Sequence, residues 1–363
     1  ALLSVEWPQE MSLAAEWGSG LYLLLTTCRD LAPSESTQRP DPMPPKDKMP
    51  RMQHLFGMLP EDLASYLRAH GVAVRDAEAR RLVAHGIAHG RHGHPTARPV
   101  PRVVEAPVDV LVDRRRLEVV ERATDPSDGF VKYLFRLDDG ALVEAVRIPL
   151  EVEGRFTVCL SSQAGCAMAC DFCATGRLGL TRHLEPWEIV AQFVMVRDEA
   201  PGVVTGAVFQ GQGEPLHNYD AVMRAAAILS HPCGGRIAAK AITISTVGLV
   251  PAILRFARER RPYKLIVSLT SAIDARRREL VPAASAWSVR ELAEAVRVYQ
   301  QAASGRVTIA WVVLGGINTG RDEIEALHDL FDGVPLRLNL IDPNDARANA
   351  YRRATDEGVS HLP

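Results

Sequence analysis

The sequence predicts an α/β protein: a parallel (β/α)6 partial TIM barrel with a small N-terminal α+β accessory domain. Six segments dense in Val, Ile and Leu have the composition of strands that are buried on both faces. Amphipathic helical stretches separate these segments, which is the alternation that produces parallel strands. Upstream, the pattern changes to short helices and then to alternating strands with tight turns. A chain of 363 residues has room for one large domain and a smaller companion.

The N-terminal part is predicted to contain an extension and a helical unit. Residues 34–50 are rich in Pro, Ser and charge and cannot bury enough apolar surface to pack. We therefore expect residues 1–50 to be a flexible extension or linker. Apolar side chains recur at helical spacing over residues 60–70 and 76–89. These two segments predict a small helical unit over residues 51–107.

A small antiparallel β element is predicted for residues 108–155. Asp-Gly pairs at 128–129 and 139–140 are typical of hairpin turns. The strands expected around these turns cover residues 108–112, 117–121, 131–137 and 142–148.

The barrel is predicted to span residues 156–345, with a C-terminal tail over residues 346–363. Its expected strands are residues 157–161, 203–210, 241–246, 264–270, 307–314 and 336–341. Its expected helices lie near residues 186–199, 218–230, 249–260, 288–303 and 321–331. Because the chemistry of such barrels gathers at the carboxyl ends of the strands, we expect the functional residues in the loops that follow them.

Composition and charge narrow the class of protein. The chain has 42 Lys and Arg against 44 Asp and Glu, so contact with RNA must use local patches rather than a global positive field. Three of the six cysteines lie between residues 166 and 173, unlike a disulfide framework, which favours a reducing cytosol. The apolar run at residues 21–25 is far shorter than the roughly 20 residues that span a bilayer. Acidic residues precede it, which argues against a signal peptide. We expect a cytoplasmic monomer without a membrane segment.

The loop after the first barrel strand carries Cys166, Cys170 and Cys173 among small residues. Thiolates are the usual ligands of iron-sulfur clusters, and three of them leave one iron of a [4Fe-4S] cluster open. The amino and carboxylate groups of S-adenosylmethionine (SAM) can chelate that iron. An electron from the cluster can then split the sulfonium and release a 5′-deoxyadenosyl radical. A zinc site with Cys159 as the fourth ligand is the alternative, although zinc knuckles normally use two C-x2-C pairs.

Polar residues at later strand ends are candidates for contact with SAM. Gly213 and Glu214 end the second strand, where the backbone can approach a ligand closely and the carboxylate can accept the SAM ammonium group. Ser245 follows in the third strand, Ser268 and Thr270 in the fourth, and Asn344 after the sixth. From the spacing alone, each residue of this second group is equally a cap of its strand end.

From about residue 59 to 353 the chain resembles the radical SAM adenine methyltransferases of ribosomal RNA, the RlmN and Cfr enzymes. The resemblance rests on CLSSQAGC at 159–166, FCATG at 172–176, GEPL at 213–216, ISTVG at 244–248, VSL at 267–269, LVP at 280–282 and NLI at 339–341. It implies methylation of carbon 2 or carbon 8 of an adenine in 23S rRNA or tRNA. It also implies a [4Fe-4S] cluster, SAM, a disulfide bond and an electron donor such as flavodoxin or ferredoxin.

The resemblance assigns roles to individual residues. In this family one SAM methylates a cysteine near the C-terminus, and a second SAM yields the radical that removes hydrogen from that S-methyl group; the carbon radical adds to adenine. Release of the adduct uses a second cysteine and a proton acceptor, which match Cys159 and Glu144. Without the resemblance, Cys159 reads as a core thiol and Glu144 as a solvated strand residue. The positions that match SAM contacts are Gly213, Glu214, Ser245, Ser268, Leu269, Thr270 and Asn344.

The chain departs from the family pattern at three places. It has no cysteine after Cys233, and we expect the methyl-carrying cysteine to lie beyond Pro363, in a truncated tail. Thr270 stands where the family usually has His, and Gln212 where Met is common. We expect the last two changes to affect the substrate and the regiochemistry more than SAM binding.

Basic and histidine-rich segments are candidates for contact with RNA. The runs at 114–116, 258–264 and 276–278 are candidates to hold phosphates, although most such runs are solvated faces. The tract of His85, His89, His92 and His94 is expected to face solvent or RNA, with metal binding as the alternative. Two rival functions stay open: a radical SAM enzyme with another substrate, and a cluster-bearing RNA-binding protein that cannot methylate.

Overall fold

A nine-stranded sheet organises the molecule. The computed structural model describes residues 52–88, 100–126, 128–303, 307–343 and 351, and within them the strand order of the large sheet is β13-β12-β11-β10-β9-β6-β5-β4-β3. The strands from β6 to β13 pair in parallel. They are β6 (Arg155–Leu160), β9 (Val203–Phe209), β10 (Ile242–Thr246), β11 (Lys264–Ser268), β12 (Val307–Val312) and β13 (Leu336–Ile341). The predicted α/β class and its parallel barrel strands are confirmed.

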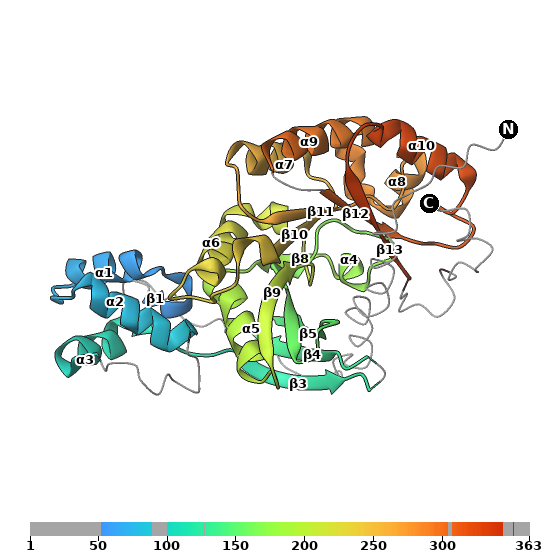
Figure 1. Ribbon diagram of the computed structural model, residues 1–363. Helices are drawn as coiled ribbons and strands as arrows, with labels where there is room; N and C mark the ends of the chain where they lie inside the picture. The colour runs from blue at the N-terminus through green and yellow to red at the C-terminus, as the bar shows by residue number, and fades with distance from the viewer. Residues whose placement is uncertain (1–51, 89–99, 127, 304–306, 344–350, 352–363) are drawn as a thin grey trace, which may run out of the picture.

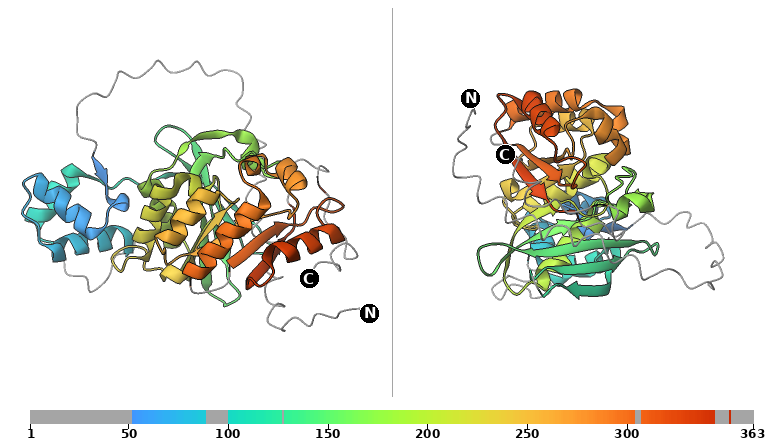
Figure 2. Two further views of the ribbon diagram at one scale, coloured as in Figure 1. Left: turned by 90° about the horizontal axis from the view of Figure 1, so that it is seen from above. Right: turned by 90° about the vertical axis from the view of Figure 1, so that its right-hand side faces the viewer.

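Helices connect the parallel strands and lie along one face of the curved sheet (Figures 1 and 2). The larger ones are α5 (Pro186–Asp198), α6 (Tyr219–Ser230), α7 (Val250–Arg258), α9 (Val289–Ala302) and α10 (Arg321–Phe331). Local signals set where they begin: Pro186 occupies the first position of α5, where its missing N–H costs nothing, and Ser288 and Glu291 form a capping box at the start of α9. Shorter elements are α4 (Ala174–Leu178), α8 (Asp274–Leu280), η7 (Pro215–Asn218), η8 (Ala239–Ala241) and η9 (Pro282–Ala286).

The predicted antiparallel strands extend the barrel sheet. They are β3 (Glu118–Thr124), β4 (Val131–Arg136) and β5 (Leu142–Pro149), and β5 pairs antiparallel with β6. The tight connection between β5 and β6, closed by the hydrogen bond from the Leu150 N–H to the Arg155 carbonyl, returns the chain beside itself. The sheet is therefore continuous across residue 155. A separate two-stranded ribbon, β7 (Gln163–Gly165) with β8 (Leu180–His183), flanks the loop between them.

The N-terminal unit consists mainly of helices, and one strand predicted at its end is absent from the described residues. Its elements are β1 (Gln53–His54), η4 (Leu55–Gly57), α1 (Pro60–Ala69), α2 (Asp76–Val83), η5 (Ala84–Ala88), α3 (Arg102–Leu111) and β2 (Val112–Asp113). The strand expected over 108–112 is wrong, because residues 108–111 are the end of α3. The valines of this segment favoured a strand. However, Val104 and Val108 lie four residues apart and are both buried on one side of a helix, while Val110 is exposed.

Specific contacts join this unit to the core. Arg224 of α6 pairs with Asp62 of α1 and donates to the Gly57 carbonyl at 3.2 Å. The His54 ring stacks on Trp187 of α5, with the ring centroids 4.1 Å apart. Among the described residues, no helix combines the length and apolar character needed to cross a membrane.

Candidate functional site

The three-cysteine loop is shaped by glycine and by backbone hydrogen bonds. Gly165 has φ +75°, and a Cβ there would lie 1.9 Å from the Gly179 carbonyl oxygen, so only glycine fits. The Cys166 N–H donates to that same carbonyl at 2.8 Å, and the Cys173 N–H donates to the Cys170 carbonyl at 3.1 Å. The loop is thereby held so that all three cysteines line one cavity.

The pKa values of these thiols are raised, so the cysteines become thiolates only when a cationic group binds beside them. Burial raises the pKa of Cys166 to about 12, and burial together with the neighbouring thiols raises the pKa of Cys170 well above its usual value. Thiolates form there only with a cationic partner, and a metal centre provides one. Among the described residues, no three His, Cys, Asp or Glu side chains are gathered closely enough for a single metal ion.

Cys159 does not complete a zinc site with these cysteines. It packs in a cluster with Phe130, Val146 and Val208, whereas Cys166 and Cys170 pack with other residues. The zinc alternative loses its fourth ligand. All five cysteines in the described part of the chain are free, so the implied disulfide bond is not formed in this structure.

A cavity of about 140 Å³ lies beside the three cysteines. It brings together the predicted residues Gly213, Glu214, Ser245 and Ser268 from the ends of β9, β10 and β11. The apolar remainder of its lining includes Met168, Ala310, Val312 and Ile341. The predicted convergence of strand-end residues on the cysteine loop is therefore what the structure contains.

Two predicted contact residues, Leu269 and Thr270, stand apart from this lining. Leu269 and Thr270 are buried next to the cavity but do not line it. Thr270 has φ +61°, a conformation that a β-branched residue rarely adopts, and its buried Oγ1 has no hydrogen-bond partner within the described part of the chain. Asn344 lies outside the described residues.

Glu214 is fixed as an acceptor at the rim of the cysteine site. Its carboxylate accepts hydrogen bonds from the Leu216 N–H at 2.9 Å and from the Val247 N–H at 2.8 Å. Burial nonetheless raises its pKa to about 7. A cationic ligand in the cavity would favour the charged carboxylate, so the group is suited to bind an ammonium.

Arg277 belongs to the basic run 276–278, which the sequence offered as a phosphate contact, but the structure buries it beside the cysteine site. Only 2% of it is exposed, and its guanidinium donates to the Leu269 carbonyl at 3.2 Å and to the Val247 carbonyl. On the same helix, the Leu280 carbonyl accepts the Asp171 N–H of the cysteine loop at 3.0 Å. Helix α8 therefore ties the cysteine loop to two strand ends. The sequence signal for this link was that Arg277 and Leu280 lie three residues apart, on one face of a helix.

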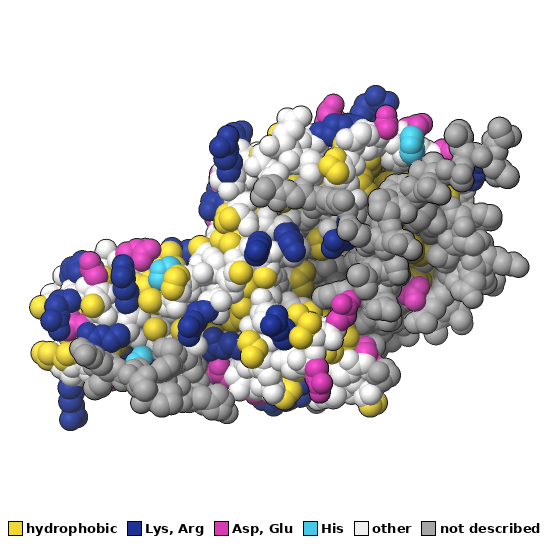
Figure 3. All heavy atoms as spheres, viewed as in Figure 1, with side chains coloured by type: hydrophobic (Ala, Val, Ile, Leu, Met, Phe, Trp, Pro, Cys, Tyr) yellow, Lys and Arg dark blue, Asp and Glu magenta, His cyan; other side chains and the backbone are white. Residues whose placement is uncertain are grey.

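The basic runs are largely engaged within the protein. Arg114, Arg115 and Arg116 pair with Asp109, Asp113 and Asp198 at 2.8, 2.6 and 2.9 Å. Arg276 pairs with Glu323 at 2.5 Å, and Arg261 with Glu259 at 2.6 Å. On the face in Figure 3, Lys and Arg side chains are scattered among neutral ones rather than gathered in one patch. Of the histidine tract, His85 lies in η5, and the other three residues lie outside the described part.

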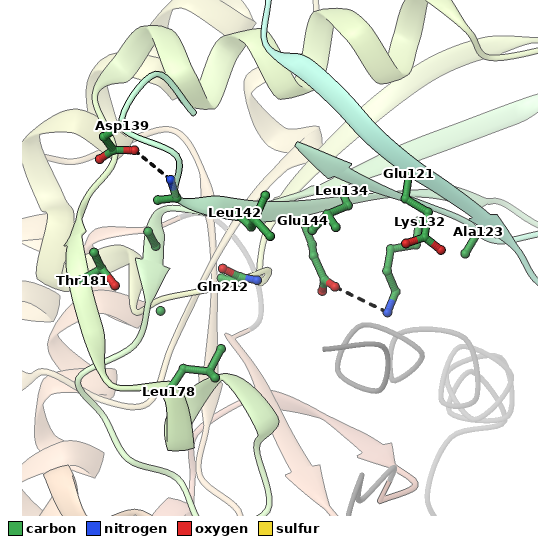
Figure 4. A pocket seen from close by; sticks show the side chains of 13 residues that line it. Glu121, Ala123, Lys132, Leu134, Asp139, Leu142, Glu144, Leu178, Thr181 and Gln212 are labelled. Atoms are coloured by element: carbon green, nitrogen blue, oxygen red, sulfur yellow. Dashed lines mark hydrogen bonds and ion pairs between the residues drawn. The ribbon is translucent and has the colours of Figure 1, made fainter. Parts of the chain in front are cut away.

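A second cavity, of about 520 Å³, lies against the antiparallel strands (Figure 4). Glu144 of β5 lines it and is only 4% exposed, so the solvated alternative is wrong. Its carboxylate lies 3.7 Å from the Lys132 ammonium of β4, an ion pair that the sequence did not reveal. Burial raises the pKa of Glu144, and Lys132 opposes that rise.

Cys159 lies on the same face of the sheet as Glu144. Cys159 on β6 is paired with Val146 on β5, two residues from Glu144, so the three side chains share one face. Burial raises the pKa of Cys159 to about 12, with a smaller contribution from the charge of Glu144. The two residues matched to product release are thus neighbours, and the thiol is held in its protonated form.

Comparisons with known proteins agree with this arrangement. A family model described as the radical SAM superfamily matches residues 160–331. A probable RNA methyltransferase of Anaeromyxobacter sp. (strain Fw109-5) is 48% identical over 297 residues, which cover 81% of this chain and 85% of that protein. A probable RNA methyltransferase of Myxococcus xanthus is 46% identical, covering 78% of this chain and 79% of that protein. The crystal structure of a radical SAM methyltransferase from Sphaerobacter thermophilus superposes with a TM-score of 0.78 at 34% identity, covering 85% of this chain and 90% of that one.

Proposed function

The chain belongs to the radical SAM RNA methyltransferases, and from this premise we propose that it methylates carbon 2 or carbon 8 of an adenine in RNA. The substrate proposed is 23S rRNA or tRNA. One observation carries the proposal: the 520 Å³ cavity with its buried Glu144–Lys132 pair adjoins the cysteine-lined cavity across residues 211–214. A relative from Myxococcus xanthus named dual-specificity RNA methyltransferase RlmN 1, 45% identical over 222 residues, supports the RlmN-like assignment.

Membership of the family implies a [4Fe-4S] cluster and SAM, and the smaller cavity has the donors to hold them. We assign Cys166, Cys170 and Cys173 to the cluster. Glu214 would bind the SAM ammonium, with Ser245 and Ser268 as further hydrogen-bonding groups. When bound, the cluster and SAM supply an electron and a 5′-deoxyadenosyl radical. Leu269, Thr270 and Asn344 remain proposed SAM contacts on the resemblance alone.

The larger cavity supplies the groups for the methyl acceptor. We assign Glu144 as the acceptor of the proton that the adenine ring carbon loses when the methylated product is released. Lys132 favours the ionised carboxylate that this role requires, because a nearby opposite charge lowers the pKa of an acid. Cys159 is assigned to the same release step, and an S-methylcysteine to the transfer of the methyl group.

The purified protein provides the test. After anaerobic reconstitution it should contain about four irons per chain and form 5′-deoxyadenosine from SAM with dithionite as reductant. With rRNA from a strain that lacks the gene, mass spectrometry of digested nucleosides should detect 2-methyladenosine or 8-methyladenosine. Formation of 5′-deoxyadenosine without methylated adenosine, over both rRNA and tRNA, would point to another substrate. RNA binding without 5′-deoxyadenosine would point to a cluster-bearing binding protein.

A further inference from the structure

Gln212 carries a buried polar atom that makes no hydrogen bond to any described residue. The residue follows β9 and is 5% exposed, and its side-chain Oε1 has no hydrogen-bond partner within the described part of the chain. Its backbone is fully engaged, since its N–H donates to the Ser161 hydroxyl at 2.9 Å and its carbonyl accepts the Ser162 N–H at 2.9 Å. The backbone thus holds the amide in place while the amide oxygen stays unpaired. An unpaired buried acceptor destabilises a fold, so a ligand that completes it is the natural explanation.

The position of this amide indicates which ligand. Gln212 lines the 520 Å³ cavity, while its neighbours Gly211 and Gly213 line the cysteine cavity, so the residue stands at the boundary between the two. In Figure 4 its side chain is drawn between Leu142 and Leu178, and all three residues line the same cavity as Glu144. Two leucines and an amide offer an apolar surface for a flat ring and a hydrogen-bonding group at its edge.

The chemistry of an amide matches adenine rather than guanine among the purines. A glutamine side chain can accept a hydrogen bond from the exocyclic amine of adenine and donate one to the adjacent ring nitrogen. Guanine presents an acceptor, O6, where adenine presents the amine, and would leave Oε1 unpaired. Methionine, which is common at this position in the family that the chain resembles, can make neither bond.

We propose that Gln212 reads the exocyclic amine of the acceptor adenine and is a specificity-determining residue of this protein. The inference rests on the proposed function, because it presumes that the second cavity receives the target base. It adds that this chain selects adenine by a direct hydrogen bond from the loop that separates the two cavities.

A binding measurement without turnover tests this. The probes are short fluorescein-labelled oligouridines that carry one central adenosine, purine riboside or inosine, titrated with the reconstituted protein in the presence of SAM and without reductant. By fluorescence anisotropy, adenosine should bind about tenfold more tightly than purine riboside, which lacks only the amine. In Gln212→Met that ratio should fall to about twofold or less. The control Gln301→Met makes the same change at an exposed position of α9 and should keep the wild-type ratio.

Thermal unfolding distinguishes a ligand-binding glutamine from a merely structural one, because the two predict changes in Tm of opposite sign. If Gln212 is kept for a ligand, Gln212→Met removes an unpaired buried acceptor at similar volume, and Tm should rise by roughly 2 °C or more. A structural amide would instead lower Tm when lost. Equal adenosine preference in wild type and Gln212→Met, or a lower Tm in the variant, overturns the inference. Absence of methylated adenosine with the adenosine preference intact would count against the proposed function alone.

Discussion

The two cavities of this molecule are built in different ways. The smaller, cysteine-lined cavity is enclosed by loops that follow parallel strands, where glycines allow close packing and few charged side chains are present. The larger cavity is lined by side chains of the antiparallel strands β3, β4 and β5, and it holds a buried ion pair and an amide oxygen without a partner among the described residues. The difference agrees with separate proposed roles: the smaller cavity generates a reactive species, and the larger cavity selects and deprotonates the acceptor. The following variants are chosen to separate the two.

The largest expected effect comes from the smaller cavity. Cys170→Ala removes one of three cluster ligands, so 5′-deoxyadenosine formation should be lost completely, together with the iron chromophore. RNA binding, which we place at the other cavity, should stay within about twofold of wild type, as expected of a change that leaves charge and phosphate contacts intact. A parallel loss of RNA affinity in a folded variant would mean that the cavities are not separable. Iron analysis, absorbance spectra and anisotropy measure the three quantities.

Glu144→Gln should impair the function assigned to the larger cavity. The amide cannot accept the proton, so methyl transfer should fall roughly 100-fold to 10,000-fold, the range for loss of a general base. Cleavage of SAM should continue at close to the wild-type rate, because Glu144 does not line the smaller cavity. Side-by-side assays of methylated adenosine and 5′-deoxyadenosine provide the measurement, and equal loss of both products would contradict the assignment.

Gly213→Ala tests how tightly the boundary between the cavities is packed. Gly213 has φ +100°, and an added Cβ would lie 2.5 Å from the Gln163 side chain. We expect the free energy of unfolding to fall by about 2–3 kcal/mol from backbone strain and overpacking together. Gly140→Ala is the matched control, since Gly140 also has positive φ but nothing lies within 4 Å of its Cβ position. Its cost should be about 1 kcal/mol, and denaturant unfolding of both variants would show whether packing adds to strain.

Lys132→Met should produce the smallest effect, a shift in pH dependence. Glu144 must be ionised to accept a proton, so the methylation rate falls as the pH drops through its pKa. Without the ammonium at 3.7 Å, that pKa should rise further, and the acid limb of the pH–rate profile should move to higher pH. Because burial already raises this pKa in the folded state, stability should decline as pH rises through it, more steeply in the variant. Lys264→Met, at an exposed position in β11, should leave the profile unchanged.

The parallel barrel strands, most of the connecting helices and the cysteine loop could be predicted from local sequence patterns. Short-range patterns predict these features: buried strands are continuous apolar runs, and the expected cluster ligands are three cysteines within eight residues. The sequence also identified Gln212 and Thr270 as departures from the family pattern. It misassigned residues 108–111, where Val104 and Val108 follow a helical spacing within a β-branched run that also fits a strand.

The surroundings of those residues depend on contacts between segments that are distant in the chain. Glu144 meets Lys132 because β4 and β5 pair in one register, and Gln212 joins them from the end of a strand far along the chain. Arg277 became a buried link between the cysteine loop and two strand ends only when α8 packed against them. Burial and hydrogen-bond partners depend on which distant segments pack together, so no local pattern reveals whether a charged or amide side chain is paired. For this reason the cysteine loop was recognisable in the sequence, while the cavity assigned to the acceptor base was not.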